Sequence, residues 1–233
     1  MDDKLKKILS GQTEDHLGYH QLLDTLCHLD AITPMNNLIE SAKSAGFQIG
    51  LTSCFRDFKT QLNIWNKKAT GRRALLDDSG LPLEFNKLSI EELLMAIMRW
   101  SAIPGASRHH WGTEFDIYDI NGLPDESYQV QLTPEEVNSG GIFGDFHDWL
   151  DLQMKDDLSF GFFRPYDVDR GGVAPERWHL SYAPVSEVYK DKFTIDLFIR
   201  VIESSDIIHS EYLIQNASAI FSQFVTNTSP FLD

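Results

Sequence analysis

Apolar residues recur at helical spacing in several segments of the chain. This spacing predicts helices over residues 33–46, 57–71, 89–100 and 143–158. Ser89-Ile90-Glu91-Glu92 has the form of a capping box, in which the serine and the second glutamate satisfy each other's backbone N–H groups at a helix start. Thr33-Pro34 predicts that the first helix begins with Thr33 as its N-cap.

Shorter segments alternate between apolar and polar residues, which is typical of strands. They cover residues 47–52 and 114–120, with further extended pieces at 160–164 and 177–182. Along the second of these strands, Phe115 and Ile117 would share one face, and Glu114 and Asp116 the other. Helices that flank short strands indicate an α+β fold with a small antiparallel sheet.

The C-terminal portion, residues 186–233, is again helical in pattern. We expect two helices between residues 185 and 225, broken near Ser204–Asp206, and we expect this portion to pack against the core. A length of 233 residues fits one domain. We therefore predict a single domain over residues 1–233, with its motif-bearing core at about 33–185.

Charge and composition narrow the possible partners. The formal net charge is −15, from 35 acidic and 20 basic residues, which argues against nucleic acid or anionic lipid as a partner. No run approaches the roughly 20 apolar residues of a membrane span. Residues 1–18 lack a secretory signal pattern, so we expect a cytoplasmic protein. Cys27 and Cys54 have no CxxC spacing and are expected to be reduced, buried thiols.

Two segments carry most of the candidate chemistry. The first, residues 107–116, contains His109 and Asp116 on either side of Gly112, and the second ends in Glu176-Arg177-Trp178-His179. Two imidazoles and one carboxylate suit zinc and leave a fourth position for water. Spacing alone leaves this open, because there is no HExxH helix and a lone histidine is more often a hydrogen-bonded structural residue.

Glu176 precedes His179 by three residues, so the two could not share a face of one regular strand. Pro175 makes a turn plausible at this point, and a turn would bring the carboxylate over a metal held by His179. A carboxylate there could accept the proton of a metal-activated water. The alternative is an ordinary solvated carboxylate.

These segments resemble a known enzyme family. Ser107-x-His109-x-x-Gly112-x-x-x-Asp116 with Glu176-x-x-His179 is similar to the motifs of the D-alanyl-D-alanine carboxypeptidase and dipeptidase family of zinc peptidases, which is related to lysostaphin-type endopeptidases and the hedgehog signalling domain. Ser53-Cys54-Phe55-Arg56, followed by Gln61, resembles the Ser-x-Tyr-Arg segment of that family. The three blocks occur in the same order and cover roughly residues 47–185.

The resemblance implies a role for each matching residue. His109, Asp116 and His179 would bind one zinc ion. Glu176 would be the catalytic base, and Arg56 would stabilise the scissile carbonyl oxygen as it becomes negative. Ser53, Gln61 and Ser107 would line the substrate cleft.

The implied reaction is removal of a terminal D-alanine from peptidoglycan-type stem peptides, so the partner would be a small peptide or muropeptide, with no obligate protein partner evident. A D-Ala-D-Ala dipeptidase and a cell-wall endopeptidase are alternatives within the same family. A zinc-containing binding module without catalysis is an alternative from another class. The presence of both Glu176 and Arg56 favours an enzyme.

The chain also departs from the family pattern. Glu114 stands where the family usually has a small residue, and it would lie either beside the metal ligands or at the rim of the cleft. Phe55 replaces a tyrosine, and His110 would support the site or contact substrate. Trp111 and Trp178 are expected to pack in the core, with a place in the cleft wall as the alternative.

Overall fold

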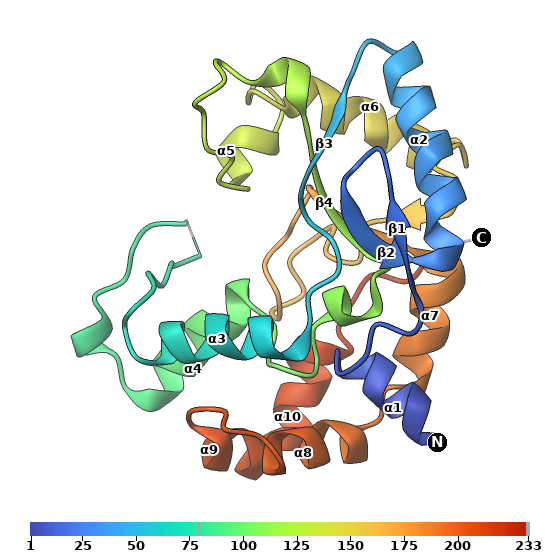
Figure 1. Ribbon diagram of the computed structural model, residues 1–233. Helices are drawn as coiled ribbons and strands as arrows, with labels where there is room; N and C mark the ends of the chain where they lie inside the picture. The colour runs from blue at the N-terminus through green and yellow to red at the C-terminus, as the bar shows by residue number, and fades with distance from the viewer. Residues whose placement is uncertain (79, 232–233) are drawn as a thin grey trace.

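An antiparallel four-stranded sheet runs through the computed structural model, which describes residues 1–78 and 80–231 (Figure 1). The strand order is β3 (Ile49–Ser53), β4 (Glu114–Asp119), β6 (His179–Tyr182) and β5 (Phe162–Phe163). Helices surround this sheet (Figure 1). The predicted α+β class with a small antiparallel sheet is therefore confirmed.

The two faces of β4 differ in polarity, as the alternation predicts. Phe115 and Ile117 are fully buried in an apolar cluster with residues of α2 (Ile32–Ser44) and α6 (Gly144–Lys155). On the other face, Asp116 pairs with Ser53 of β3 and with His179 of β6. Directly opposed residues in a sheet lie close together, so the register itself brings these three side chains into one row.

The helices before β4 begin close to where the sequence predicts. Asp57 caps α3 (Phe58–Ala69) by accepting a bond from Thr60 N at 2.7 Å, and the capping box of α4 (Ile90–Trp100) is formed. The expected start of α2 is wrong. A 3₁₀ turn at Leu29–Ala31 leads directly into this helix, so Thr33 and Pro34 lie inside its first turn.

Between α3 and α4 the chain forms a 3₁₀ turn at Phe85–Lys87. Another follows β4 at Ile120–Gly122, and α5 spans Pro134–Val137.

The C-terminal portion contains more helices than the pattern predicts. Among the described residues these are α7 (Ala183–Lys192), α8 (Ile195–Glu203), α9 (Ser210–Gln215) and α10 (Ala217–Ile220), followed by a π-helical turn at Phe221–Val225. The expectation of two helices is wrong, because Thr194 caps a new helix by accepting from Leu197 N. The predicted break near Ser204 is confirmed.

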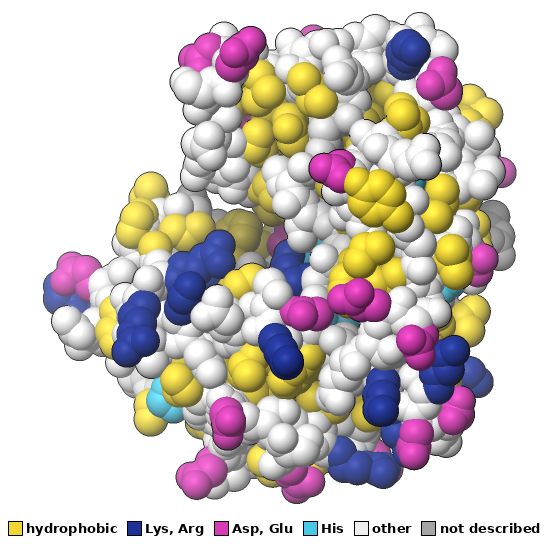
Figure 2. Space-filling model, in the orientation of Figure 1, with side chains coloured by type: hydrophobic (Ala, Val, Ile, Leu, Met, Phe, Trp, Pro, Cys, Tyr) yellow, Lys and Arg dark blue, Asp and Glu magenta, His cyan; other side chains and the backbone are white. Residues whose placement is uncertain are grey.

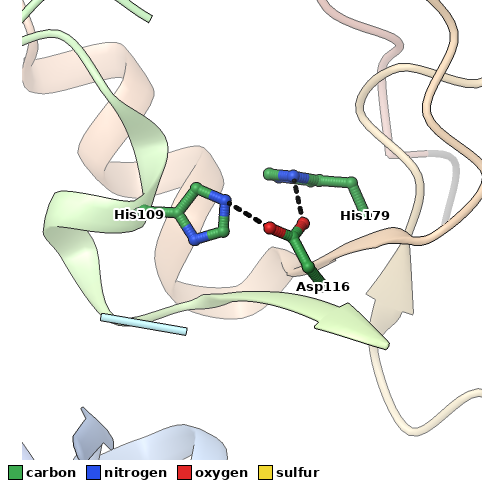
Figure 3. Close-up of side chains that lie close together, drawn as sticks. All are labelled: His109, Asp116 and His179. Carbon is green, nitrogen blue, oxygen red and sulfur yellow. Dashed lines mark ion pairs between the residues drawn. The ribbon is translucent and has the colours of Figure 1, made fainter. Parts of the chain in front are cut away.

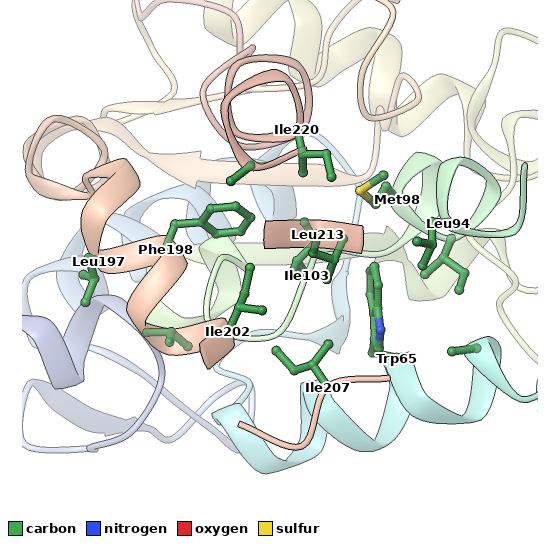
Figure 4. Packing of buried hydrophobic residues seen from close by; sticks show 14 of the residues in the cluster. Trp65, Leu94, Met98, Ile103, Leu197, Phe198, Ile202, Ile207, Leu213 and Ile220 are labelled. Atoms are coloured by element: carbon green, nitrogen blue, oxygen red, sulfur yellow. The ribbon is translucent and has the colours of Figure 1, made fainter. Parts of the chain in front are cut away.

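These helices share a core with α3 and α4. Trp65 and Leu94 pack with Phe198, Ile202 and Leu213, all buried, as Figure 4 shows. The C-terminal portion therefore packs against the helices beside the cleft described below.

The N-terminal residues form elements that the sequence pattern did not reveal. These are α1 (Asp3–Leu9) and a hairpin of β1 (Leu17–His20) and β2 (Thr25–His28). Trp111 Nε1 donates to Leu9 O at 3.2 Å, and His28 N donates to Gly112 O at 2.8 Å. The N-terminal part thus supports the loop that carries His109.

Cys27 and Cys54 are buried free thiols, as expected. Across the described residues, no helix is both long enough and apolar enough to cross a membrane.

Candidate metal site and active-site cleft

Three side chains from distant parts of the chain meet at the polar face of the sheet. His109, Asp116 and His179 each place one ligand atom within 4.8 Å of the others, and all three residues are buried (Figure 3). His109 Nε2 lies 3.3 Å from Asp116 Oδ2, and His179 Nδ1 lies 3.0 Å from Asp116 Oδ1. The structure therefore brings together the three residues predicted as metal ligands.

The local backbone explains how His109 reaches this point. It belongs to a 3₁₀ turn, Arg108–Trp111, which ends at Gly112 with φ +68° before β4 begins. A Cβ on Gly112 would lie 2.8 Å from His28 N, a backbone atom that has little freedom to move. Glycine is therefore required both by the left-handed conformation and by the close approach of β2.

Hydrogen bonds of the two imidazoles determine which ring nitrogen of each is directed at the cluster. His109 Nδ1 lies 2.7 Å from Cys54 O and must carry a proton to donate to that carbonyl, which leaves Nε2 bare. His179 Nε2 lies 2.8 Å from Glu114 Oε2 and donates to it, which directs Nδ1 toward Asp116. Each imidazole thus turns one ring nitrogen to the same place, as metal ligands do, and a metal ion would displace the proton that His179 Nδ1 shares with Asp116.

The charges around this point favour a cation. Burial alone would raise the pKa of Asp116, but the neighbouring His109 and His179 imidazoles outweigh it and hold that pKa far below its ordinary value. Burial alone would lower the pKa of His179, but its bonds with Asp116 and Glu114 raise it to about 10. Asp116 Oδ1 is buried and contacts His179 Nδ1. Two nitrogens and this oxygen fit zinc.

Glu176 lies beside the ligands because the chain turns before β6. His179 N donates to Glu176 O at 3.1 Å, which closes a turn of four residues, and β6 starts only at His179. The turn suggested by Pro175 is thus present, and Glu176 Oε2 lies 3.4 Å from His179 Nδ1. Burial raises the pKa of Glu176 to about 7, so this carboxyl group can exchange a proton near neutral pH.

Arg56 follows β3 and is held on both sides. Its Nη1 donates to Gln61 Oε1 at 2.8 Å and its Nη2 to Ser53 Oγ at 2.9 Å. Gln61 is fully buried, and its Nε2 donates to Ala102 O at 2.7 Å. The structure therefore places Gln61 behind Arg56 and not at the cleft surface, where the resemblance put it.

His110 also supports Arg56. It is fully buried, its Nδ1 lies 2.6 Å from Arg56 O, and its Nε2 accepts from Gly105 N at 3.0 Å. Because burial lowers its pKa to about 3, His110 is neutral at physiological pH. Its place inside the protein excludes the direct substrate contact that was one of its two expected roles.

The ligand cluster opens into a cleft of about 460 Å³. Ser53, Arg56 and Ser107 line it, as the resemblance implies, together with Glu176. Trp178 both packs in a small apolar cluster and lines the cleft, whereas Trp111 packs in the core.

Sequence reasoning missed several residues of the cleft wall, among them Tyr166, Lys68 and Arg73. Tyr166 lies with its ring centroid 5.1 Å from that of His179. Lys68 is a buried lysine on α3, and its Nζ donates to Ser101 Oγ at 2.7 Å. The signal for Lys68 was present, since it falls on the face of α3 that buries Gln61 and Trp65.

Glu114 proves to be fully buried beside His179 and does not reach the rim. Burial would raise the pKa of Glu114, but the charge of Arg108 and the bond with His179 lower it to about 2. It is therefore a carboxylate in contact with a candidate ligand.

Comparison with known proteins identifies the family. The family model described as VanY, D-alanyl-D-alanine carboxypeptidase, matches residues 25–185, well over half of the chain. This chain belongs to the VanY family. The match begins at β2 and ends at the start of α7, so it includes every candidate site residue named above.

Two individual relatives are similar in sequence. An uncharacterized protein of Haemophilus influenzae is 33% identical over 125 residues, which cover 53% of this chain and 92% of that protein. A second uncharacterized protein of the same species is 35% identical over 100 residues, covering 42% and 68%.

Among solved structures, a Zn(II) complex of the vancomycin-resistance D,D-pentapeptidase VanY has a TM-score of 0.50 at 19% identity, covering 78% of this chain and 88% of that one. VanYB in complex with D-Alanine-D-Alanine has a TM-score of 0.48 at 18% identity, covering 76% and 84%. At these identities the likeness of the first concerns the fold.

Proposed function

We propose that this protein is a zinc-dependent carboxypeptidase that removes a terminal D-alanine from peptidoglycan-type stem peptides. The observation that carries the proposal is the cluster of His109, Asp116 and His179 with Glu176 beside it, in a chain of the VanY family. A metal-holding module without catalysis would not need a further carboxyl group 3.4 Å from a ligand imidazole.

Each residue has a chemical task in this reaction. His109, Asp116 and His179 would hold a zinc ion, which would supply a Lewis acid able to make water nucleophilic near neutral pH. Glu176 takes the proton of the attacking water and returns it to the leaving amine. The guanidinium of Arg56 lines the cleft and is directed by Ser53 and Gln61, so it can stabilise negative charge on the carbonyl oxygen.

A group of unpaired cations favours a carboxypeptidase over an endopeptidase. Arg56, Lys68 and Arg73 all line the cleft, and none of them forms an ion pair with a carboxylate of the described residues. In contrast, Arg99 and Arg177 each contact aspartates. Figure 2 shows Lys and Arg side chains on the lower side of the hollow at the left of the molecule. Cations without a partner would suit the free C-terminal carboxylate of a substrate, which an internal peptide bond lacks.

The test is hydrolysis of three substrates, with the products identified by mass spectrometry: a pentapeptide ending in D-Ala-D-Ala, which would release D-alanine, the same peptide with an amidated C-terminus, which would release D-alaninamide, and free D-Ala-D-Ala. We expect turnover of the first only, abolished by a zinc chelator and restored by added zinc. Cleavage of the dipeptide alone would indicate a dipeptidase, and equal cleavage of the amidated peptide would indicate an endopeptidase.

Glu176→Gln separates catalysis from metal binding. The amide cannot accept the proton, so we expect zinc to bind normally and the rate of turnover to fall by about 10²–10⁴-fold. A variant that binds zinc and turns over at the wild-type rate would refute the role of Glu176 as the base.

A further inference from the structure

Glu114 is a buried charge in contact with a candidate zinc ligand. None of its surface is exposed, and it lies on the polar face of β4, opposite Ser181 and two residues before Asp116. Its Oε2 lies 2.8 Å from His179 Nε2, and its Oε1 accepts bonds from the Ser181 and Thr113 hydroxyls at 2.8 and 2.9 Å. Burying a carboxylate is costly unless it is well paired, so Glu114 requires other groups that balance its charge.

The main compensating charge is Arg108, itself only 4% exposed. Its Nε lies 3.4 Å from Glu114 Oε2, and its Nη2 donates to Ser181 Oγ at 2.6 Å. Its guanidinium lies over the Trp111 ring, 4.9 Å from the ring centroid. The arginine is therefore held in place from several sides, with one edge directed at Glu114.

We propose that Glu114 is a positioning residue that orients His179 for zinc binding, and that Arg108 balances its charge. The inference rests on the zinc site of the proposed function. By accepting a proton from Nε2, the carboxylate keeps the Nδ1 lone pair of His179 aimed at the ion and makes the imidazole a stronger ligand. A small residue at position 114, which is usual in the family, could do neither.

Arg108 is needed because carboxylates are crowded at this point. Glu114 and Asp116 lie on either side of the His179 imidazole, and Glu176 lies 3.4 Å from its Nδ1. The fixed positive charge of Arg108 behind Glu114 offsets the repulsion among these carboxylates and keeps Glu114 against His179.

The test is the affinity for zinc, measured on metal-free protein by competition with a chromophoric chelator. We expect Glu114→Ala to weaken zinc binding by about 10–100-fold. Glu114→Gln keeps a hydrogen-bond acceptor for His179 and should recover part of this loss. Ser186→Ala is the matched control, because Ser186 is fully buried and contacts Ser181, in the same network, but not His179. Its zinc affinity should equal that of the wild type.

Arg108→Met completes a double-mutant cycle with Glu114→Gln. We expect Arg108→Met to weaken zinc binding alone but to add little in the Glu114→Gln background, because the charge that it balances is then absent. Thermal unfolding of each variant shows whether the variant is folded. Zinc affinity is then calculated per folded molecule, so that a loss of fold is not mistaken for a loss of affinity.

The outcomes separate the inference from the proposed function. Wild-type affinity in both Glu114 variants, or equal losses in Ser186→Ala, would overturn the positioning role while leaving the zinc peptidase intact. If the wild type itself binds no zinc, or if His109→Ala binds it equally well, both proposals fail.

Discussion

Replacement of Lys68 should raise the stability of the protein and lower its activity. It tests whether the cations that line the cleft bind the substrate carboxylate. The residue is 8% exposed and its Nζ has one hydrogen bond, to Ser101. Burial, followed by the charge of Arg73, lowers the pKa of Lys68 to about 8 from 10.5. A pKa that is lower in the folded state means that folding disfavours the charged form by about 3 kcal/mol below pH 8.

Lys68→Met removes this penalty and also removes the bond to Ser101, which is worth about 1.5–3 kcal/mol for a charged donor. We therefore expect a net gain in the free energy of unfolding of about 1 kcal/mol at pH 7, or roughly 2–4 °C in melting temperature. The pH dependence has a definite sign. Between about pH 8 and 10.5 the unfolded wild type holds more protons, so its stability rises with pH, and the variant should lack this rise.

Activity should change in the opposite direction. Loss of a charged contact to the substrate carboxylate should lower kcat/KM by about 10–100-fold on the free pentapeptide. Melting curves by circular dichroism and D-alanine release measure the two effects, with Lys67→Met, an exposed neighbour on the same helix, as the control. A Lys68→Met protein that loses both stability and activity would show a structural lysine and refute the reasoning.

Two further predictions concern the support of the site. Gly112→Ala would strain a left-handed residue and push against His28 N, so we expect destabilisation of about 1–3 kcal/mol and weaker zinc binding; a variant with unchanged melting and zinc affinity would contradict this. His16 is buried and its pKa is lowered to about 4, chiefly by burial. The unfolded chain binds its proton first as pH falls from 6.5, so the wild type should lose up to about 3 kcal/mol by pH 4 through this residue. Measured by urea unfolding, His16→Leu should lose less stability than the wild type between pH 6.5 and pH 4. An identical dependence of stability on pH in the two proteins would refute the assignment.

The site was predictable where short motifs and sheet register coincide. Asp116 and His179 meet because they are directly paired residues of β4 and β6, and the alternation of β4 already placed Asp116 away from the core. Gly112 indicated the turn that brings His109 to them. A turn after Pro175 explained how Glu176 could lie beside His179.

Other features depend on pairings that a single sequence does not reveal. Arg108 and Glu114 are six residues apart, yet their contact depends on a turn and on Ser181 from another strand. Gln61 matched a cleft position, but only the packing of α3 shows that it lies behind Arg56. The hairpin of β1 and β2 has four-residue strands, too short for a clear alternation, and it is stabilised by contacts with the loop of Gly112.

The measurement that tests the central claim most directly is anomalous diffraction at the zinc edge from crystals of the protein grown with one equivalent of zinc. We predict a single strong peak bound by His109 Nε2, an oxygen of Asp116 and His179 Nδ1. Absence of a peak at these three atoms, or a zinc ion held elsewhere by other residues, would contradict the account.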